Sequence, residues 1–333
     1  MATKSGRLAS LDMLKGFAIL MVIAGHAVQY LISGEYYDKV VYRIIYSFHM
    51  PLFMAVAGYL QGGGKHKTVS QLTKRAVYLL TPLIVYAFFM RYVLHESNHF
   101  TGCIKYSLWF LKSALLCTIL FSATRLIPQP RRWIAVLFTL GLSQILLIYN
   151  VKYMYPCFLG GALLRSNTGW FMAKKRSLTV AAGITWLVLV LFFNQYFWSY
   201  ISLDTQNILP FETMTDPNWW FIAVYRTIIG LAGSLMFFGL FEMLATRGFH
   251  QTLVSRILNK VGQETLWIYV LQTAILEVYL ARMLNFDAIH PLIFYALLVP
   301  LISAGVLVIS MLIIHFTRRT ITITKIFLTR QLT

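Results

Sequence analysis

The sequence predicts an all-α fold: a polytopic integral membrane protein with about ten transmembrane helices. Of its 333 residues, 58% are hydrophobic and only 12% are charged, whereas a soluble domain carries roughly a quarter charged residues. Apolar runs recur along the whole chain, and at ~20 residues per crossing this length holds roughly ten spans with short loops. These two observations exclude a water-soluble globular protein and predict one membrane-embedded domain.

Each apolar run is bounded by polar residues or by Pro and Gly, which sets the limits of the expected helices. The first run follows Lys4 and Arg7, as in a signal sequence, but it continues to Ile32 without a small-residue cleavage site, so it should remain as a helix. The sixth run is short for a complete crossing, and Lys152 lies at the break before it. In chain order, the expected helices are 11–32, 42–62, 75–95, 106–125, 133–149, 153–165, 178–200, 219–245, 263–283 and 290–316.

The basic residues predict the orientation of these helices. An even number of spans puts both termini on one side, and 21 of the 29 Lys and Arg residues fall on that side, in the segments 1–15, 63–75, 125–132, 165–176, 246–260 and 317–333. Short cytoplasmic loops accumulate Lys and Arg, so both termini should be cytoplasmic. The loops 33–41, 97–105, 202–217 and 284–289 should lie outside. The single domain is expected to cover 1–333, with a core of about 8–316 and a cytoplasmic tail over 317–333.

The net charge of +18 has two interpretations. A strongly basic soluble protein would suggest a nucleic-acid partner, but here the basic residues form small clusters between apolar runs, which favours topology over nucleic-acid binding. Cys103, Cys117 and Cys157 are an odd number without close pairing. They predict neither a disulfide framework nor a metal site.

Ionisable residues inside apolar runs are candidates for a functional site, because a charge in hydrocarbon is costly. Five residues qualify: His26, His49, Arg91, Arg226 and Glu277. For Arg91, Arg226 and Glu277, structural ion pairing is an equally open interpretation.

The first expected helix is the most informative. Lys15 and His26 are eleven residues apart, which is three helical turns plus ~20°, so they share one face with a separation of ~16 Å along the axis. Asp12 lies near the same face and could pair with Lys15. A neutral His26 imidazole, placed deeper in the membrane than the charged Lys15 at its edge, suits general-base chemistry on a hydroxyl. A structural histidine that bonds a neighbouring helix is the alternative.

The second expected helix carries His49 next to Pro51. Proline frees the backbone carbonyl four residues earlier and kinks a helix, and such kinks often lie beside intramembrane sites. A packing kink with His49 bonded to a neighbour is the other interpretation.

These motifs together give the chain a resemblance to the bacterial membrane acyltransferase-3 family, O-acyltransferases that modify cell-surface glycans and related molecules. The segment 11–16 followed by Gly25 and His26 resembles the family's motif of an arginine, ten residues and a histidine, with Lys15 at the arginine position. The segments 48–53 and 57–59 resemble its second-helix signature, and Lys74 and Arg75 leading to 79–82 resemble its basic entry to the third helix. Weaker similarities are found at 108–111, 155–161, 225–227 and 262–269.

The resemblance implies acyl transfer from cytoplasmic acyl-coenzyme A, typically acetyl-coenzyme A, to a hydroxyl of a surface or lipid-linked carbohydrate, in the bacterial inner membrane. The coenzyme would be a donor substrate and not a bound cofactor. Its phosphates would meet Lys15, Lys74 and Arg75, and His26 would deprotonate the acceptor.

His49 or Arg226 could then stabilise the oxyanion. An acyl-histidine intermediate is a less favoured variant. The oligomeric state stays open, a homo-oligomer included.

Three departures from the family pattern limit the transfer of roles. Lys15 replaces the usual arginine, Tyr78 stands where a second arginine often follows Arg75, and Gln272 stands where a motif of the ninth helix often ends in histidine. Two other functions remain as alternatives: a secondary transporter or channel, which also needs ten helices and buried ionisable residues, and a membrane subunit without catalysis, which the three departures favour. No inverted repeat in the sequence supports the transporter.

Overall fold

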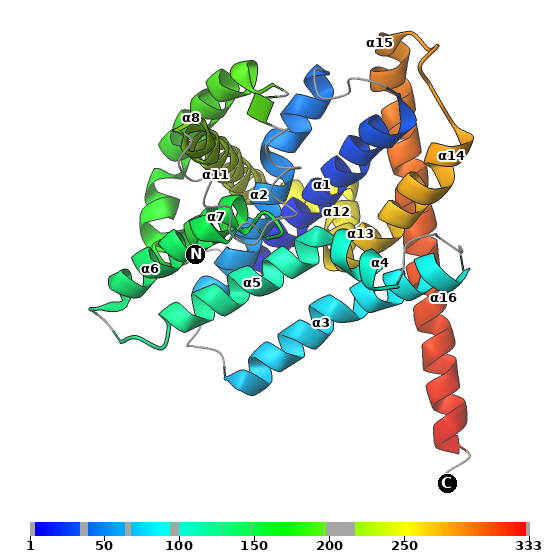
Figure 1. Cartoon of the computed structure of the whole chain (residues 1–333), viewed down its shortest axis with the longest axis horizontal. Helices are drawn as coiled ribbons and strands as arrows, with labels where there is room; N and C mark the ends of the chain where they lie inside the picture. The colour runs from blue at the N-terminus through cyan, green and yellow to red at the C-terminus, as the bar shows by residue number, and fades with distance from the viewer. Residues whose placement is uncertain are drawn as a thin grey trace.

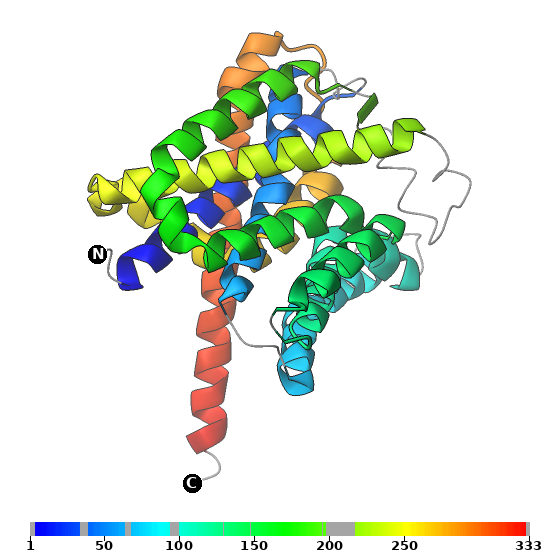
Figure 2. The same ribbon diagram turned by 90° about the vertical axis from the view of Figure 1, so that its left-hand side faces the viewer.

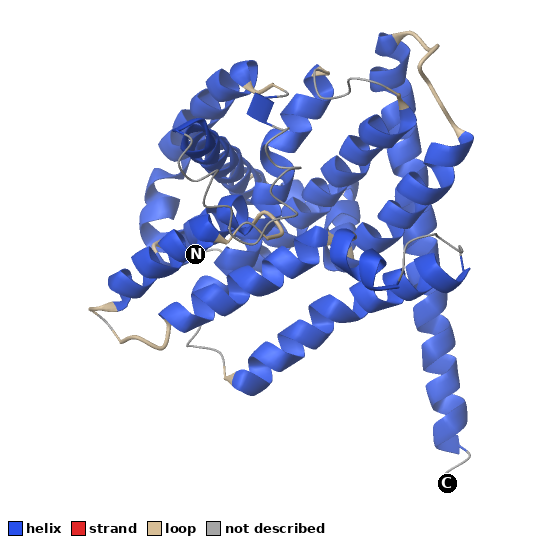
Figure 3. Cartoon of the chain, in the orientation of Figure 1, coloured by secondary structure: helices blue, strands red, loops and turns tan. Residues whose placement is uncertain are grey.

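The computed structural model describes residues 4–33, 39–63, 68–93, 100–128, 130–146, 148–194, 196–197 and 217–330. Within these ranges every regular element is a helix, as Figure 3 shows. Seven helical stretches there are long and apolar enough to cross a membrane, at 9–31, 40–62, 69–92, 168–192, 217–246, 265–283 and 291–320. The prediction of an all-α polytopic membrane protein is confirmed.

The helices are labelled in chain order in Figure 1. They are α1 (Lys4–Leu31), α2 (Val40–Gly62), α3 (Val69–Phe88), η2 (Phe89–Val93), α4 (Phe100–Tyr106), α5 (Trp109–Thr124), α6 (Arg132–Ile145), α7 (Val151–Ser166), α8 (Thr168–Phe192), α11 (Pro217–Thr246), η3 (Phe249–Gln251), α12 (Leu253–Gln263), α13 (Thr265–Thr273), η4 (Ala274–Leu280), α14 (Ala281–Met283), α15 (Pro291–Ile293), η5 (Phe294–Leu298) and α16 (Val299–Arg330). The segments η2, η4 and η5 are π-helical turns that continue α3, α13 and α15.

Helices α1 and α2 form the centre of the molecule. Two-thirds of the residues in their most apolar windows are buried (67% in each), against 22–44% in the other candidate spans. Helix α1 packs on α2, α11, α12 and α16, while α2 packs on α7 and α11. Figure 2 shows α11 running across α2, and α11 also packs on α8, so α2 is covered from this side. The two candidate histidines therefore lie on the helices with the most protein around them.

Glycines bring the central helices into backbone contact with their neighbours. A Cβ atom at Gly58 would overlap the carbonyl of Phe158, and one at Gly161 would overlap the carbonyl of Ala55, so α2 and α7 touch at both points. Helix α1 meets α12 in the same way. Small residues are the usual means of close helix approach in membranes. These contacts fix the positions of α1 and α2 relative to the helices that complete the site.

Several expected boundaries are wrong. The segment 165–176 is not a loop, because α7 and α8 are separated by Asn167 alone. The segment 246–260 contains most of α12, whose sequence is too polar overall to be found as an apolar run, although it packs Leu258 and Val261 inward. The last helix does not end at 316, since α16 continues to Arg330 and extends beyond the other helices in Figures 1 and 2.

The number of crossings and the orientation remain predictions. Helices α5 and α6 are apolar but have only 16 and 14 residues, and α7 has 16. Residues 34–38 of the expected loop 33–41, residues 97–99 of the loop 97–105 and residues 202–216 of the loop 202–217 lie outside the described residues.

Candidate active site

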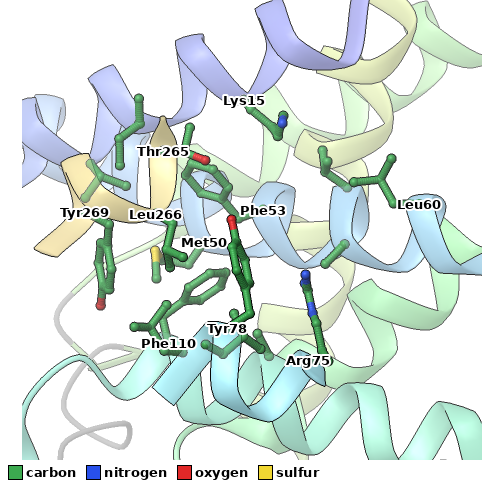
Figure 4. Close-up of a pocket in the computed structure, with 17 residues that line it drawn as sticks. Lys15, Met50, Phe53, Leu60, Arg75, Tyr78, Phe110, Thr265, Leu266 and Tyr269 are labelled. Carbon is green, nitrogen blue, oxygen red and sulfur yellow. The ribbon is translucent and has the colours of Figure 1, made fainter. Parts of the chain in front are cut away.

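A cavity between α1, α2, α3, α5 and α13 contains two of the predicted donor-binding residues. Lys15 lines it from α1, and Arg75 lines it from α3 together with Tyr78. Figure 4 shows that Arg75 and Tyr78 point from α3 toward the helix that carries Lys15. The rest of the wall is mostly apolar, with Met50 and Phe53 among its residues. We call this the basic cavity; it has a volume of about 170 Å³.

The charges of the basic cavity are only partly neutralised. Lys15 Nζ lies 2.7 Å from a carboxylate oxygen of Asp12, which is the pair that the helical spacing predicts. The guanidinium of Arg75 lies 5.6 Å from the centre of the Tyr78 ring, and its buried Nε has no hydrogen-bond partner among the described residues. Lys74 is exposed and does not line this cavity. Lys15 and Arg75 together form a cationic end suited to phosphate oxygens.

A second cavity lies farther along α1. His26 and Tyr30 line it from α1, Trp109 from α5, and Tyr269 and Glu277 from α13 and η4. We call this the histidine cavity. It has a volume of about 370 Å³, which falls in the range of small-molecule sites, roughly 300–1,000 Å³. Since it is wider and more polar than the basic cavity, it is better suited to a polar ring-shaped ligand.

His26 is held by one well-defined hydrogen bond. Its Nδ1 lies 2.9 Å from Oε1 of Gln272. The Gln272 amide can take only one orientation, because its Nε2 donates to the backbone oxygen of Tyr269 (3.0 Å) and to Oγ1 of Thr273 (2.7 Å), and a carbonyl oxygen only accepts. The hydrogen between His26 and Gln272 must therefore be on Nδ1 when the ring is neutral. The lone pair of Nε2 is left for chemistry in the cavity.

The two cavities are adjacent and share Tyr269. In the described part of the chain this is the one residue that lines both of them. The adjoining end of α5 also lies there, with Phe110 on the basic cavity and Trp109 on the histidine cavity. The site thus consists of two adjacent chambers, with Lys15 and Arg75 lining one and His26 lining the other.

His49 is buried on the central helix, with 2% of its surface exposed. Its Nδ1 donates to the backbone oxygen of Ile45 at 2.7 Å, and its ring packs edge-on against Tyr46. His26 and Arg226 are both close enough to interact with it electrostatically. His49 itself is among the lining residues of neither cavity.

Arg226 is also buried and lies away from the two cavities. Its guanidinium stacks on Tyr153 at 5.1 Å and on Phe193 at 5.5 Å, and it donates to the backbone oxygen of Phe197. The structure therefore places the three predicted catalytic side chains near one another, but only His26 faces a cavity.

Two residues of the site were not predicted to act in it. Gln272 was recognised only as a departure from a motif, and its partner His26 is 246 positions away in the sequence, so no local signal reveals the pair. Tyr269 was noted only as part of a weak motif. Its position between the chambers depends on how α13 packs against α1 and α3.

A family model described as an acyltransferase domain matches residues 8–315. Nodulation protein NolL of Mesorhizobium japonicum is 25% identical over 94% of this chain and 87% of its own length. Nodulation protein NolL of Sinorhizobium fredii is 26% identical over 82% of this chain and 79% of its own length. No solved structure matches.

Proposed function

The chain belongs to the acyltransferase-3 family of membrane acyltransferases, and from this premise we propose that it moves an acetyl group from cytoplasmic acetyl-coenzyme A to a hydroxyl of a carbohydrate. The observation that supports this most is the pair of adjacent cavities that share Tyr269, with cations lining one and a histidine of fixed tautomer lining the other. The acceptor would be a cell-surface or lipid-linked sugar, and the protein would work in the bacterial inner membrane.

The basic cavity is the proposed donor side. Lys15 and Arg75 would bind phosphate oxygens of the coenzyme, Lys15 as a point charge and Arg75 through its planar fork. Lys74 would assist from the exposed surface next to them. The pantetheine arm would follow the apolar wall of this narrow cavity, over the ~16 Å that separates Lys15 from His26 along α1, and would bring the thioester to Tyr269.

The histidine cavity is the proposed acceptor side. Aromatic side chains and polar groups line it together, a combination that suits a sugar ring. His26 Nε2 takes the proton of the acceptor hydroxyl while the acceptor oxygen forms a bond to the acetyl carbon. The carbon–sulfur bond then breaks, and the coenzyme A thiolate leaves and takes up the proton that His26 releases. No acyl-enzyme is needed.

His49 and Arg226 have an indirect role in this proposal. Neither lines the basic cavity or the histidine cavity, so they would maintain the electrostatic and packing environment of His26 and not contact the oxyanion. A different donor to the oxyanion is then required.

The function is tested with purified protein in liposomes, radiolabelled acetyl-coenzyme A and a crude surface glycan. We expect acetyl transfer by the wild type and a loss of about 10²–10⁴ in kcat for His26→Ala, the usual share of general-base catalysis, with coenzyme A binding retained. His26→Gln that folds and transfers acetyl at the wild-type rate would end the catalytic assignment. Solute flux in sealed vesicles without any acetyl transfer would indicate the transporter.

The orientation is tested separately by single-cysteine labelling in intact cells. With cytoplasmic termini, an impermeant reagent should not reach cysteines placed at positions 66 and 250. Labelling at either position contradicts the ten-helix topology and the assignment of the basic cavity to the cytoplasm.

A further inference from the structure

We infer that Tyr269 is a catalytic residue, whose hydroxyl donates a hydrogen bond to the thioester oxygen as the acceptor attacks. The inference rests on the proposed function, because it needs an acyl group that passes from the basic cavity to the histidine cavity. It assigns the oxyanion donor, which neither His49 nor Arg226 supplies from its position.

The first support is the position of the side chain. Tyr269 is the residue that both cavities share in the described part of the chain, so an acyl group that moves from the Lys15 side to the His26 side passes next to it. The carbonyl under attack must lie at this point, because its carbon has to face the acceptor while its sulfur still belongs to the donor.

The second support is the contact between Tyr269 and the start of α5. The Tyr269 ring packs edge-on against the ring of Phe110, with 6.0 Å between the ring centres, and Phe110 is the second residue of α5. The N–H groups in the first turn of a helix lack acceptors within the helix and carry its positive end. Tyr269 therefore lies beside the positive end of α5.

The third support is the environment. Tyr269 is 8% exposed, and a hydrogen bond in such a site is stronger than in water. The positive end of the α5 dipole beside the ring favours donation by the phenol. Leu108, at the start of this helix, has a left-handed backbone (φ 48°) and gives α5 no side-chain cap.

The fourth support is a direct link to the base. The Gln272 side chain that fixes His26 is anchored on the backbone oxygen of Tyr269. The base and the proposed oxyanion donor are therefore held by the same turn of α13. This is the arrangement that preorganised stabilisation of a transition state requires.

The first experiment removes the hydroxyl alone. Tyr269→Phe in the full-length protein should lower kcat by about 10²–10³, the usual effect of losing one oxyanion donor, and leave the KM for acetyl-coenzyme A nearly unchanged. Tyr155→Phe is the matched control, because it also deletes a buried hydroxyl, one bonded to Thr139 at 2.9 Å, but away from both cavities. It should retain the wild-type kcat.

The second experiment tests the contact with the oxygen itself. In the dithioester analogue of acetyl-coenzyme A, sulfur replaces the carbonyl oxygen and accepts hydrogen bonds poorly. The wild type should prefer the oxygen substrate by a larger factor than the uncatalysed reaction does, and Tyr269→Phe should reduce that preference. A role in folding alone does not change this ratio.

The outcomes separate the two proposals. An inactive wild type defeats the proposed function. An active wild type with a folded Tyr269→Phe variant of equal kcat, or with an unchanged oxygen-to-sulfur ratio, overturns the inference about Tyr269 and leaves the function standing. If the variant does not fold, a wild-type ratio equal to that of the uncatalysed reaction overturns the inference.

Discussion

Replacement of Gln272 by methionine tests how the tautomer of His26 is maintained. Methionine has a similar length and keeps the volume of this fully buried position (0% exposed), but it neither accepts from Nδ1 nor donates to Tyr269. The His26 ring would then be free to take the other tautomer, with hydrogen on the nitrogen that has to act as the base.

The magnitude follows from the lost hydrogen bond. A buried N–H that loses its acceptor costs ~1–3 kcal/mol, which corresponds to a factor of about 5–150 in the population of the productive tautomer, at ~1.4 kcal/mol per factor of ten. We expect kcat to fall by about 10- to 100-fold. The effect should stay below the ~10⁴-fold loss that follows when the wrong tautomer is enforced in a serine protease triad.

The assay measures release of the coenzyme A thiol at saturating acceptor, over a range of acetyl-coenzyme A concentrations. The donor KM should not change, because Gln272 lies away from the basic cavity. Gln272→His, which again offers a ring nitrogen, should retain more activity than Gln272→Met. A folded Gln272→Met protein with the wild-type kcat refutes the reasoning. Independently of activity, ¹⁵N spectra of histidine-labelled protein should show His26 protonated at Nδ1 in the wild type and a mixture in Gln272→Met.

Three further outcomes are expected. Arg75→Ala should raise the donor KM more than it lowers kcat, whereas Lys74→Ala, which changes an exposed side chain outside the cavity, should have a smaller effect; donor titrations decide, and equal effects would remove Arg75 from the donor site. Gly161→Val should lower the melting temperature or prevent folding, because its Cβ would overlap a backbone carbonyl of α2, and a wild-type melting curve would contradict that packing. Hydrogen bonds from Ser33 and Asn285 hold the pKa of Asp287 below its ordinary value. The stabilisation that they give is therefore present near neutral pH and is lost as the pH falls below ~3.9. The melting temperatures of the wild type and of Asp287→Asn should converge in that acidic range.

The sequence predicts a helix correctly wherever an apolar run is long enough to form one. Each of the ten apolar runs corresponds to a helix, and the ion pair between Lys15 and Asp12 follows from helical spacing alone. Helix α12 could not be found in this way, since it has only 11 residues and its exposed side mixes the apolar Leu253, Val254 and Ile257 with the basic Arg256 and Lys260. Its position depends on the glycine contact between α1 and α12, a tertiary feature that a hydropathy pattern does not contain.

In the candidate site, too, features within one helix could be predicted and contacts between distant helices could not. The shared face of Lys15 and His26 follows from the sequence of one helix, and the structure puts each residue in a cavity. The contributions of Gln272 and Tyr269 come from α13, more than two hundred residues later, and depend on how α13 packs against α1. His49 and Arg226 were selected because an ionisable group is costly in the membrane, and both are indeed buried. That criterion does not distinguish a side chain that lines a cavity from one that is packed in the protein interior.

In the proposed reaction an acetyl group and a proton pass Tyr269 in opposite directions, and this exchange carries no net charge across the membrane. The acceptor loses a proton and gains an acetyl group, while coenzyme A loses the acetyl group and gains a proton, so each molecule has the same charge before and after a turnover. A membrane potential does work only on net charge that crosses it. Energised and depolarised cells should therefore acetylate their surface to the same extent at the same acetyl-coenzyme A concentration.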